Sequence, residues 1–411
     1  MRFDILKLHE VILLTINETL KTPITDSCDV LVCGGGFGGI SAALAAARKG
    51  KKVILLEKLY MLGGLGTAGI VTIYLPLCDG MGKQVSFGIA EELLRLSISM
   101  KEEAKYPANW LEGIGTKTDK DPRFEVQYNP EIFAMLVEKE LLKAGVKILY
   151  GSYAVAVSKH GDKIDAVIIE NKSGRSAIKV GSVVDATGDC DIAKFSEAPT
   201  DTFKQGNILA AWYYSVGDEG YKLNMLGFAD VPDDEKTEQN KVETLVNRRF
   251  SGLSGEELSE MMQLSHASTL NDITKKRKTD PFLMPTTIAT TPQIRMTRKI
   301  VGEYALDTAE MHKYFEDSIG MVSDWRKRGP VYEVPFRTLY SKEVKNLITA
   351  GRCTSVTESM WDIMRVIPCC SVTGEAAGTA AAMTDDFTTL DVTKLQEALT
   401  KNGVVLHEND L

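Results

Sequence analysis

The stretch VLVCGGGFGGISAALAAAR, residues 30–48, decides the fold. Its first four residues are apolar and end at a run of glycines, which predicts a buried parallel strand over 30–33. The alanine-rich segment 40–48 favours a helix that Gly50 closes. A second apolar run, 53–56, ends at Glu57 and predicts another strand. Together these segments predict one strand–helix–strand unit.

Three glycines between the first strand and the helix, Gly34, Gly36 and Gly39, have the spacing G-x-G-x-x-G. The first permits a tight turn, the second lets a pyrophosphate approach the backbone, and the third lets the helix pack closely on the strand. Glu57 follows the second strand, where an acid accepts hydrogen bonds from ribose hydroxyls. The unit predicts a dinucleotide site, but such an acid serves FAD and NAD alike.

The rest of the chain divides by its pattern. Helices are expected over 89–96 and 132–142, and short strands over 147–149, 154–157, 166–169 and 182–185, with a hairpin turn at 159–162. Between 193 and 337 the alternation of strands and helices is lost. A strand expected over 209–214 and a helix expected over 244–263 indicate an inserted cap. A strand over 346–350 and an alanine-rich helix over 374–383 then return to the first domain. We therefore expect an extension over 1–25, a nucleotide domain over 26–192, a cap over 193–337 and a return with tail over 338–411. The apolar run 11–14 is read as an extra strand or helix.

Composition excludes several classes of protein. The net charge is -8 and the one basic run, Lys275 to Lys278, is short, so nucleic acid is not expected as a partner. The sequence has seven cysteines, an odd number, and none of them forms a C-x-x-C pair. This pattern argues against a metal site or a disulfide framework, and it predicts that the protein is located in the reducing cytoplasm. No apolar stretch has the length of a membrane span, so no membrane partner is expected.

Later motifs carry a specific resemblance. They are VVDATGD at 183–189, NLITAGR at 346–352, R-V-x-P at 365–368 and GEAAG at 374–378. With the glycine turn, they make the chain resemble the broad FAD-dependent oxidoreductase family of the glutathione-reductase structural group. The resemblance covers nearly everything from Cys28 to Met383. It implies an α/β fold with a Rossmann-type FAD-binding domain, a mixed α+β cap inserted in it, and FAD as cofactor.

The resemblance also implies which residues hold the cofactor. Gly34, Gly36, Gly39 and Glu57 would bind the ADP half, and the helix expected to start near Thr373 would point its positive end at the flavin. The other implied contacts are Phe37, Gly38, Lys58, Gly63, Gly64, Thr67, Ala154, Ala186, Thr187, Gly188, Gly351 and Arg352.

Four residues of the cap are candidate catalytic groups. Guanidinium groups suit carboxylates and phosphates, and the three-residue spacing of Arg295 and Arg298 would place both on one helix face, where they could clamp an anionic substrate. Structural ion pairs are the alternative for both arginines. His266 and His312, the only histidines in the cap, could act as a general base, although solvated histidines are commoner.

These residues predict an FAD-dependent dehydrogenase or reductase that transfers a hydride between a small polar, perhaps anionic, substrate and flavin N5. The direction and the electron donor or acceptor are open, as is homo-oligomerisation. No second G-x-G-x-x-G occurs between 150 and 340, so a separate NAD(P)H domain is not expected. Two alternatives are a flavin-bearing electron-transfer subunit of a larger complex and, against the acidic charge balance, an RNA-modifying flavoprotein.

Overall fold

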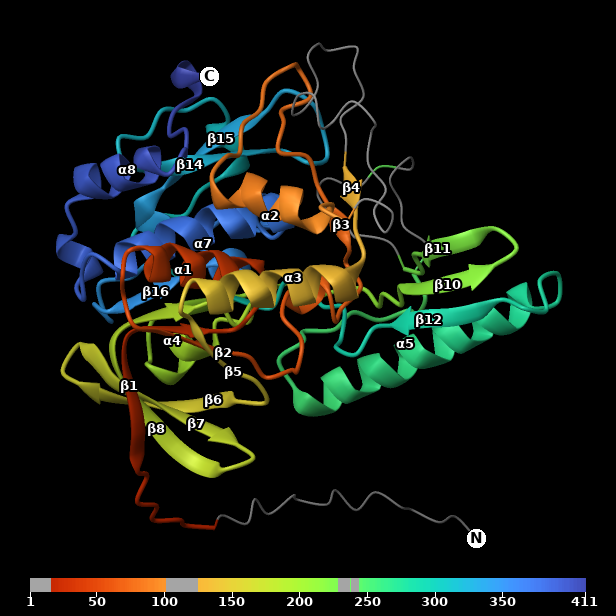
Figure 1. The fold of residues 1–411 in the computed structure, drawn as a ribbon, viewed down its shortest axis with the longest axis horizontal. Coiled ribbons are helices and arrows are strands. Elements are labelled where there is room, and N and C mark those ends of the chain that lie inside the picture. Colours follow the sequence, from red (N-terminus) through yellow and green to blue (C-terminus); the bar gives the residue numbers. More distant parts are fainter. Residues whose placement is uncertain (1–15, 101–124, 228–236, 238–243) are drawn as a thin grey trace, which may run out of the picture.

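A computed structural model describes residues 16–100, 125–227, 237 and 244–411. The run 11–14, for which an extra strand or helix is expected, lies outside these residues. The expected α/β fold with a Rossmann-type parallel sheet is confirmed (Figure 1).

The central sheet has seven strands in the order β5-β2-β1-β8-β7-β6, with β16 also paired to β8. Its strands are β1 (Ile24–Cys33), β2 (Val53–Leu56), β5 (Lys147–Leu149), β6 (Tyr153–His160), β7 (Lys163–Asn171), β8 (Gly174–Asp185) and β16 (Leu347–Thr349). β1, β2, β5, β8 and β16 run parallel, whereas β6, β7 and the first half of β8 form an antiparallel meander.

The apolar run of β1 is explained by burial on both faces of the sheet. Val30 and Val32 belong to one core cluster together with the helices, and Leu31 and Cys33 belong to a second cluster on the opposite face. Successive side chains of a strand point to opposite faces, so a strand buried on both sides is apolar throughout.

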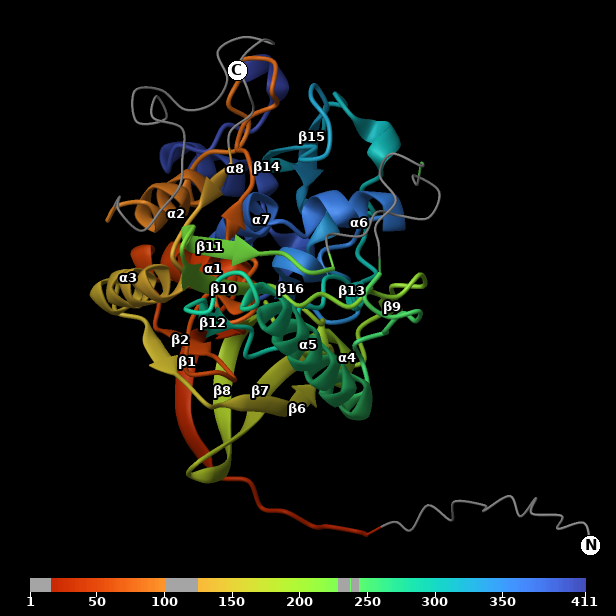
Figure 2. The ribbon, with the colours of Figure 1, turned by 90° about the vertical axis from the view of Figure 1, so that its right-hand side faces the viewer.

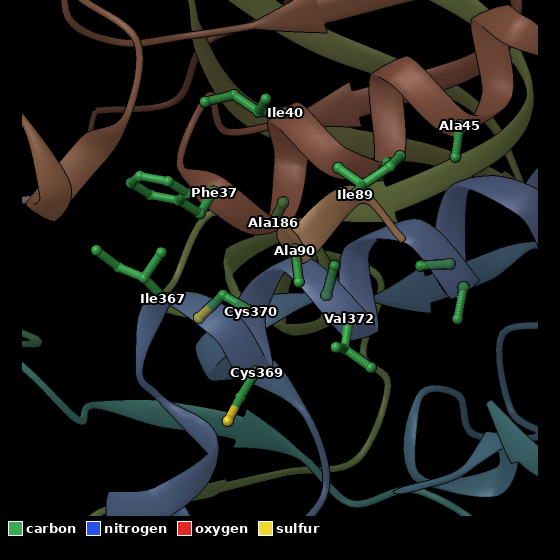
Figure 3. Close-up of a cluster of buried hydrophobic side chains, with 14 of the residues drawn as sticks. Phe37, Ile40, Ala45, Ile89, Ala90, Ala186, Ile367, Cys369, Cys370 and Val372 are labelled. Atoms are coloured by element: carbon green, nitrogen blue, oxygen red, sulfur yellow. The ribbon is translucent and has the colours of Figure 1, made fainter. Parts of the chain in front are cut away.

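Two small-residue helices cross closely above the sheet. They are α1 (Phe37–Arg48) and α7 (Ile367–Ala381). A Cβ on Gly374 would lie 2.2 Å from the carbonyl oxygen of Gly38, and a Cβ on Gly378 would lie 2.1 Å from that of Ala42. Only glycine fits these two points of α7, which is why the helix is rich in small residues. Figure 3 shows α1 and α7 side chains in one apolar cluster.

The start of α7 corrects one prediction. The sequence pattern predicted a helix that begins near Thr373, but α7 begins at Ile367. Pro368 stands in the first turn of the helix, where its missing N–H has no intrahelical partner to lose. Thr373 therefore lies in the interior of the helix, not at its positive end.

The remaining helices and strands of the nucleotide half surround this core. They are η1 (Gly64–Gly66), β3 (Ile73–Tyr74), α2 (Ile89–Ser97), β4 (Val126–Gln127), α3 (Pro130–Lys143), α4 (Asp191–Phe195), η6 (Gly351–Cys353), α6 (Glu358–Met364), η7 (Phe387–Thr389), α8 (Val392–Lys401) and η8 (Glu408–Asp410). α3 begins two residues before the helix expected over 132–142, where the side chain of Asn129 caps it by accepting a hydrogen bond from the N–H of Ile132 at 2.9 Å.

The insertion has a small sheet of its own. β10 (Tyr213–Gly217) lies between β11 (Gly220–Asn224) and β12 (Met284–Ile288), and α5 (Gly255–Lys276) lies beside them at the side of the molecule (Figures 1 and 2). The helix expected over 244–263 is thus displaced toward the C-terminus. It cannot start earlier, because Ser254 caps it and Glu257 accepts hydrogen bonds from the N–H groups of Ser251 and Gly252. The strand expected over 209–214 is displaced in the same direction.

A second part of the insertion, drawn from both of its ends, packs away from this small sheet. Its elements are β9 (Thr200–Thr202), β13 (Arg298–Ile300), η4 (Thr308–Glu310), β14 (Ser318–Ser323), β15 (Val331–Pro335) and η5 (Phe336–Thr338). β9 pairs with β13, and β14 pairs with β15 beside α7 (Figure 2). Ile319, Val322 and Val334 share the core cluster of α1 and α7. The division of the chain at residues 192 and 337 stays a proposal.

Candidate functional site

The turn between β1 and α1 is built by glycines with different surroundings. Gly34 has a φ of +107°, and a Cβ there would lie 2.3 Å from the carbonyl oxygen of Ala186. A Cβ on Gly39 would lie 1.8 Å from the carbonyl oxygen of Gly34. A Cβ on Gly36, in contrast, would meet no protein atom within 4 Å. The first and third glycines are thus required by the protein's own packing, whereas the second faces open space that a pyrophosphate can enter.

Glu57 is tied to this turn. Its Oε2 accepts a hydrogen bond from the N–H of Gly35 at 2.8 Å, and its Oε1 accepts one from the N–H of Leu59, also at 2.8 Å. Burial raises the pKa of Glu57, and the two N–H donors oppose that rise. The carboxylate is therefore fixed at the end of β2, with lone pairs left for hydroxyl donors such as those of a ribose.

A cavity of about 510 Å³ begins at this turn and reaches the insertion. Glycines of the turn and Glu57 line it, as do Trp212 and Arg295 from the insertion. Most of the predicted cofactor residues line it: Gly34, Gly36, Phe37, Gly38, Glu57, Lys58, Gly63, Gly64, Ala154, Ala186, Thr187, Gly188, Gly351 and Arg352. An open glycine, a fixed acid and a large cavity together fit a dinucleotide cofactor.

Three predicted cofactor residues lie behind the cavity wall. Gly39 packs on Gly34. Thr67 is buried and donates a hydrogen bond to the carbonyl of Leu62, within van der Waals reach of Gly63. Thr373 accepts a hydrogen bond from the N–H of Gly351 at 3.0 Å. Each of the three supports a residue that does line the cavity.

Arg352 joins the nucleotide half to the insertion. Its Nη1 donates to the carbonyl oxygen of Arg295 at 2.7 Å, and its Nη2 lies 3.5 Å from Oδ1 of Asp189. A Cβ on Gly188 would lie 2.3 Å from that Nη2, so the glycine leaves the room that the guanidinium needs. Arg352 thus holds the loop before β13 against the carboxyl end of β8.

Arg295 is the buried cation of the cavity. Its side chain lies with the guanidinium carbon 5.1 Å from the ring centre of Trp212, and its Nη1 donates to the carbonyl oxygen of Gln293 at 3.3 Å. Its Nη2 is buried and has no hydrogen-bond partner among the described residues. Burial, reinforced by the nearby charges of Arg365 and Arg352, lowers the pKa of Arg295 to about 9. The protein holds this positive charge at a free-energy cost.

The other three catalytic candidates lie elsewhere. Arg298 does not share a helix face with Arg295, since it opens strand β13 and pairs with Asp191 at 3.2 Å, outside the cavity lining. His266 is exposed on α5. His312, also exposed, contacts Glu408 through Nδ1 at 2.9 Å. Among the residues that the structure describes, no histidine lines the cavity.

Arg365 and Trp325 are two of the lining residues that had not been predicted. Arg365 follows α6, and its Nε donates to Oδ1 of Asp362 at 2.9 Å. Trp325 donates from Nε1 to the carbonyl oxygen of Asp362 at 3.0 Å, and Arg365 lies over its ring. The R-V-x-P motif at 365–368 was a signal for Arg365. The sequence around Trp325 contains no pattern that distinguishes a cavity residue from a residue of a surface loop.

Two classes of feature were not found in the described part of the chain. It holds no cluster of three or more histidine, cysteine, aspartate or glutamate side chains suited to a metal ion. Nor does it hold a helix with the length and apolar character that a membrane crossing demands. The seven cysteines are buried free thiols.

Comparisons with known proteins agree on the family. The sequence model of the family described as "FAD dependent oxidoreductase" matches residues 29–210 and 202–399. The 3-hydroxybenzoate 6-hydroxylase 1 of Aquipseudomonas alcaligenes is 29% identical over 164 residues, which are 38% of this chain and 40% of that enzyme. The thioredoxin reductase of Ureaplasma parvum is 32% identical over 76 residues, 18% of this chain and 25% of that enzyme. The chain thus spans less than half the length of these curated relatives.

A solved structure shares the fold. The p-nitrophenol 4-monooxygenase PnpA from Pseudomonas putida DLL-E4 superposes with a TM-score of 0.50 at 10% identity, covering 93% of this chain and 85% of that one. The family match extends over most of the sequence, and the glycine turn, the fixed acid and the cavity fit the cofactor that it requires. The chain therefore belongs to the FAD dependent oxidoreductase family, and its cofactor is FAD.

Proposed function

We propose that the protein transfers a hydride between a small polar organic molecule and N5 of its flavin. One observation carries this proposal: a single cavity joins the dinucleotide turn to the insertion, so that Gly36 and Glu57 share it with Trp212 and Arg295. A cofactor held at the turn would leave room for a substrate where the insertion closes the cavity. The flavin, when bound, supplies the redox chemistry.

We propose that the ADP half lies against Gly34, Gly36 and Glu57, and the flavin toward Gly351 and the start of α7. Two features support this direction. Ile367, the first residue of α7, lines the cavity. Backbone N–H groups in the first turn of a helix have no intrahelical acceptor and stabilise negative charge nearby.

The role of the insertion in this proposal is to orient the substrate and to exclude water. Trp212, Trp325 and Ile294 give the cavity apolar walls. Arg295 supplies a positive charge for an anionic group of the substrate, whereas Arg298, His266 and His312 have no place in the lining. Since no histidine lies among the described residues of the lining, a proton released or taken up in the reaction would be exchanged with solvent or with a carboxylate of the lining.

An absorbance spectrum of the purified protein tests the proposal. The sample is recorded before and after anaerobic addition of hydroxy acids, amino acids and sugars, and then of NADH or NADPH. We expect a flavin spectrum that one class of organic compound bleaches. A flavin that only NADH or NADPH reduces would make the protein a reductase. A flavin that only a copurifying redox partner reduces would contradict the proposal in favour of an electron-transfer subunit.

A further inference from the structure

A network of buried and half-buried arginine and aspartate side chains lies on and behind the wall of the cavity. Its members are Arg295, Arg298, Arg326, Arg352, Arg365, Asp189, Asp191, Asp324 and Asp362. The pairs are Arg298 with Asp191 at 3.2 Å, Arg352 with Asp189 at 3.5 Å, Arg326 with Asp324 at 3.0 Å, and Arg365 with Asp362. Within this group, Arg295 is left without a carboxylate.

Asp362 does not neutralise Arg295. Its Oδ1 accepts from Arg365, and its Oδ2 lies 3.8 Å from Nη1 of Arg326. Its charge acts on Arg295 from a distance and opposes the effect of burial only in part, as the lowered pKa of Arg295 shows. A buried guanidinium with an unpartnered nitrogen is an unusual arrangement, because proteins pair nearly all buried polar groups.

The guanidinium is held in place from one side. It lies over Trp212, whose Nε1 donates to the carbonyl oxygen of Gly227 at 3.3 Å and whose N–H donates to Oε1 of Gln293 at 2.7 Å. Gln293 is itself anchored, because its Nε2 donates to the carbonyl oxygen of Gly69. The side chain of Arg295, which lines the cavity, is therefore held on a rigid support, and this reduces the entropy lost when a ligand binds.

We propose that Arg295 binds the carboxylate of a monoanionic substrate whose remaining body is planar and apolar. This inference rests on the proposed function and names its substrate class. Arg295 is one guanidinium without a paired carboxylate among the described residues, which matches a single anionic group of the substrate. A planar guanidinium matches a carboxylate. The apolar lining from Val71, Ile73, Leu75, Trp212, Ile294 and Trp325 favours an unsaturated or aromatic body over a sugar.

Isothermal titration calorimetry of the FAD-loaded protein with three probes tests this inference. Benzoate has both a carboxylate and a planar aromatic ring. Benzamide has the ring without the charge, and acetate has the carboxylate without the ring. We expect benzoate to bind at least about tenfold more tightly than either of the others, since a hydrogen bond to a charged group contributes about 1.5–3 kcal/mol. Equal binding of benzamide and benzoate, or no benzoate binding, would overturn the inference.

Two variants separate a binding role from a structural one. Arg295→Gln should weaken benzoate binding at least about tenfold, and Arg295→Lys should retain part of it. The matched control is Arg337→Gln, which removes an exposed arginine paired with Asp317 and should leave benzoate binding unchanged. Loss of FAD from both Arg295 variants would assign this residue to the cofactor and overturn the inference. So would unchanged benzoate binding in Arg295→Gln.

The two proposals fail in different ways. Calorimetry reads benzoate binding without any redox step, so a flavin that no organic compound bleaches would refute hydride transfer while benzoate still binds through Arg295. A flavin bleached by neutral compounds, with no benzoate binding, would instead support hydride transfer and refute the carboxylate site.

Discussion

Glu375 offers a stability test that can be worked out from its surroundings. It lies in α7 and is almost fully buried. Its Oε2 accepts a hydrogen bond from the N–H of Ile89, at the start of α2, at 2.7 Å, whereas its Oε1 has no partner among the described residues. Burial raises its pKa from 4.5 to about 7, with Glu92 acting in the same direction and Ile89 and Arg48 in the opposite one.

The sign of the effect follows from the raised pKa of Glu375. Between pH 4.5 and about 7 the folded protein keeps this proton and the unfolded chain has lost it. The free energy of unfolding therefore falls as the pH rises through this window, and the loss is complete above it. The shift corresponds to about 3 kcal/mol, since one pKa unit is about 1.4 kcal/mol. Glutamine at position 375 would keep an acceptor for Ile89 without the charge.

Urea denaturation of the wild type and Glu375→Gln, followed by tryptophan fluorescence at pH 5 and pH 8, measures this effect. We expect the free energy of unfolding of the variant minus that of the wild type to be about 2–3 kcal/mol larger at pH 8 than at pH 5. Glu397→Gln, which changes an exposed residue of α8, is the control and should show no such rise. A difference between Glu375→Gln and wild type that is the same at both pH values would refute the reasoning.

Three further substitutions test the site and the core. Gly36→Ala puts a methyl group where no protein atom lies within 4 Å, so the melting temperature of the apoprotein should stay unchanged while the FAD content falls; full FAD content would contradict the assignment of the pyrophosphate site. Gly39→Ala puts a Cβ 1.8 Å from the carbonyl oxygen of Gly34, and we expect little folded protein in a solubility assay. Normal yield would show that the turn can relax. Phe133→Ala removes a buried ring whose centre lies 4.9 Å from that of Phe37. It should lower the free energy of unfolding, measured by urea denaturation, by about 3–5 kcal/mol. A loss of less than about 1 kcal/mol would contradict this expectation.

The local parts of the fold were predictable from the sequence. The strand expected over 30–33 lies within β1, and the one expected over 53–56 coincides with β2. Here hydrophobic runs and glycine turns act over a few residues, so each segment carries its own evidence. The predicted cofactor contacts rest on the same kind of local evidence, because the G-x-G-x-x-G spacing and Glu57 belong to one strand–helix–strand unit, and they stay a prediction.

The conformation around Arg295 could not be predicted, because distant residues determine it. Asn207 accepts hydrogen bonds from the N–H groups of Arg295 and Met296 at 3.1 and 2.9 Å. Its Nδ2 donates to the carbonyl oxygen of Met296. This one side chain holds a segment without helix or strand where the three-residue arginine spacing suggested a helix. Tertiary contacts of this kind override local propensity, and a single sequence does not reveal them.

The position of β16 has a consequence for synthesis on the ribosome. β8 pairs with β16 through Val183 and Leu347, so one edge of β8 stays open while the whole insertion is translated. At about 5–20 residues per second, that interval is on the order of ten seconds. An unpaired strand edge invites pairing with other chains, and contacts between distant segments form slowly. We therefore expect nascent chains stalled before residue 347 to bind chaperones and to be cut by added protease, and chains extended past α7 to resist it.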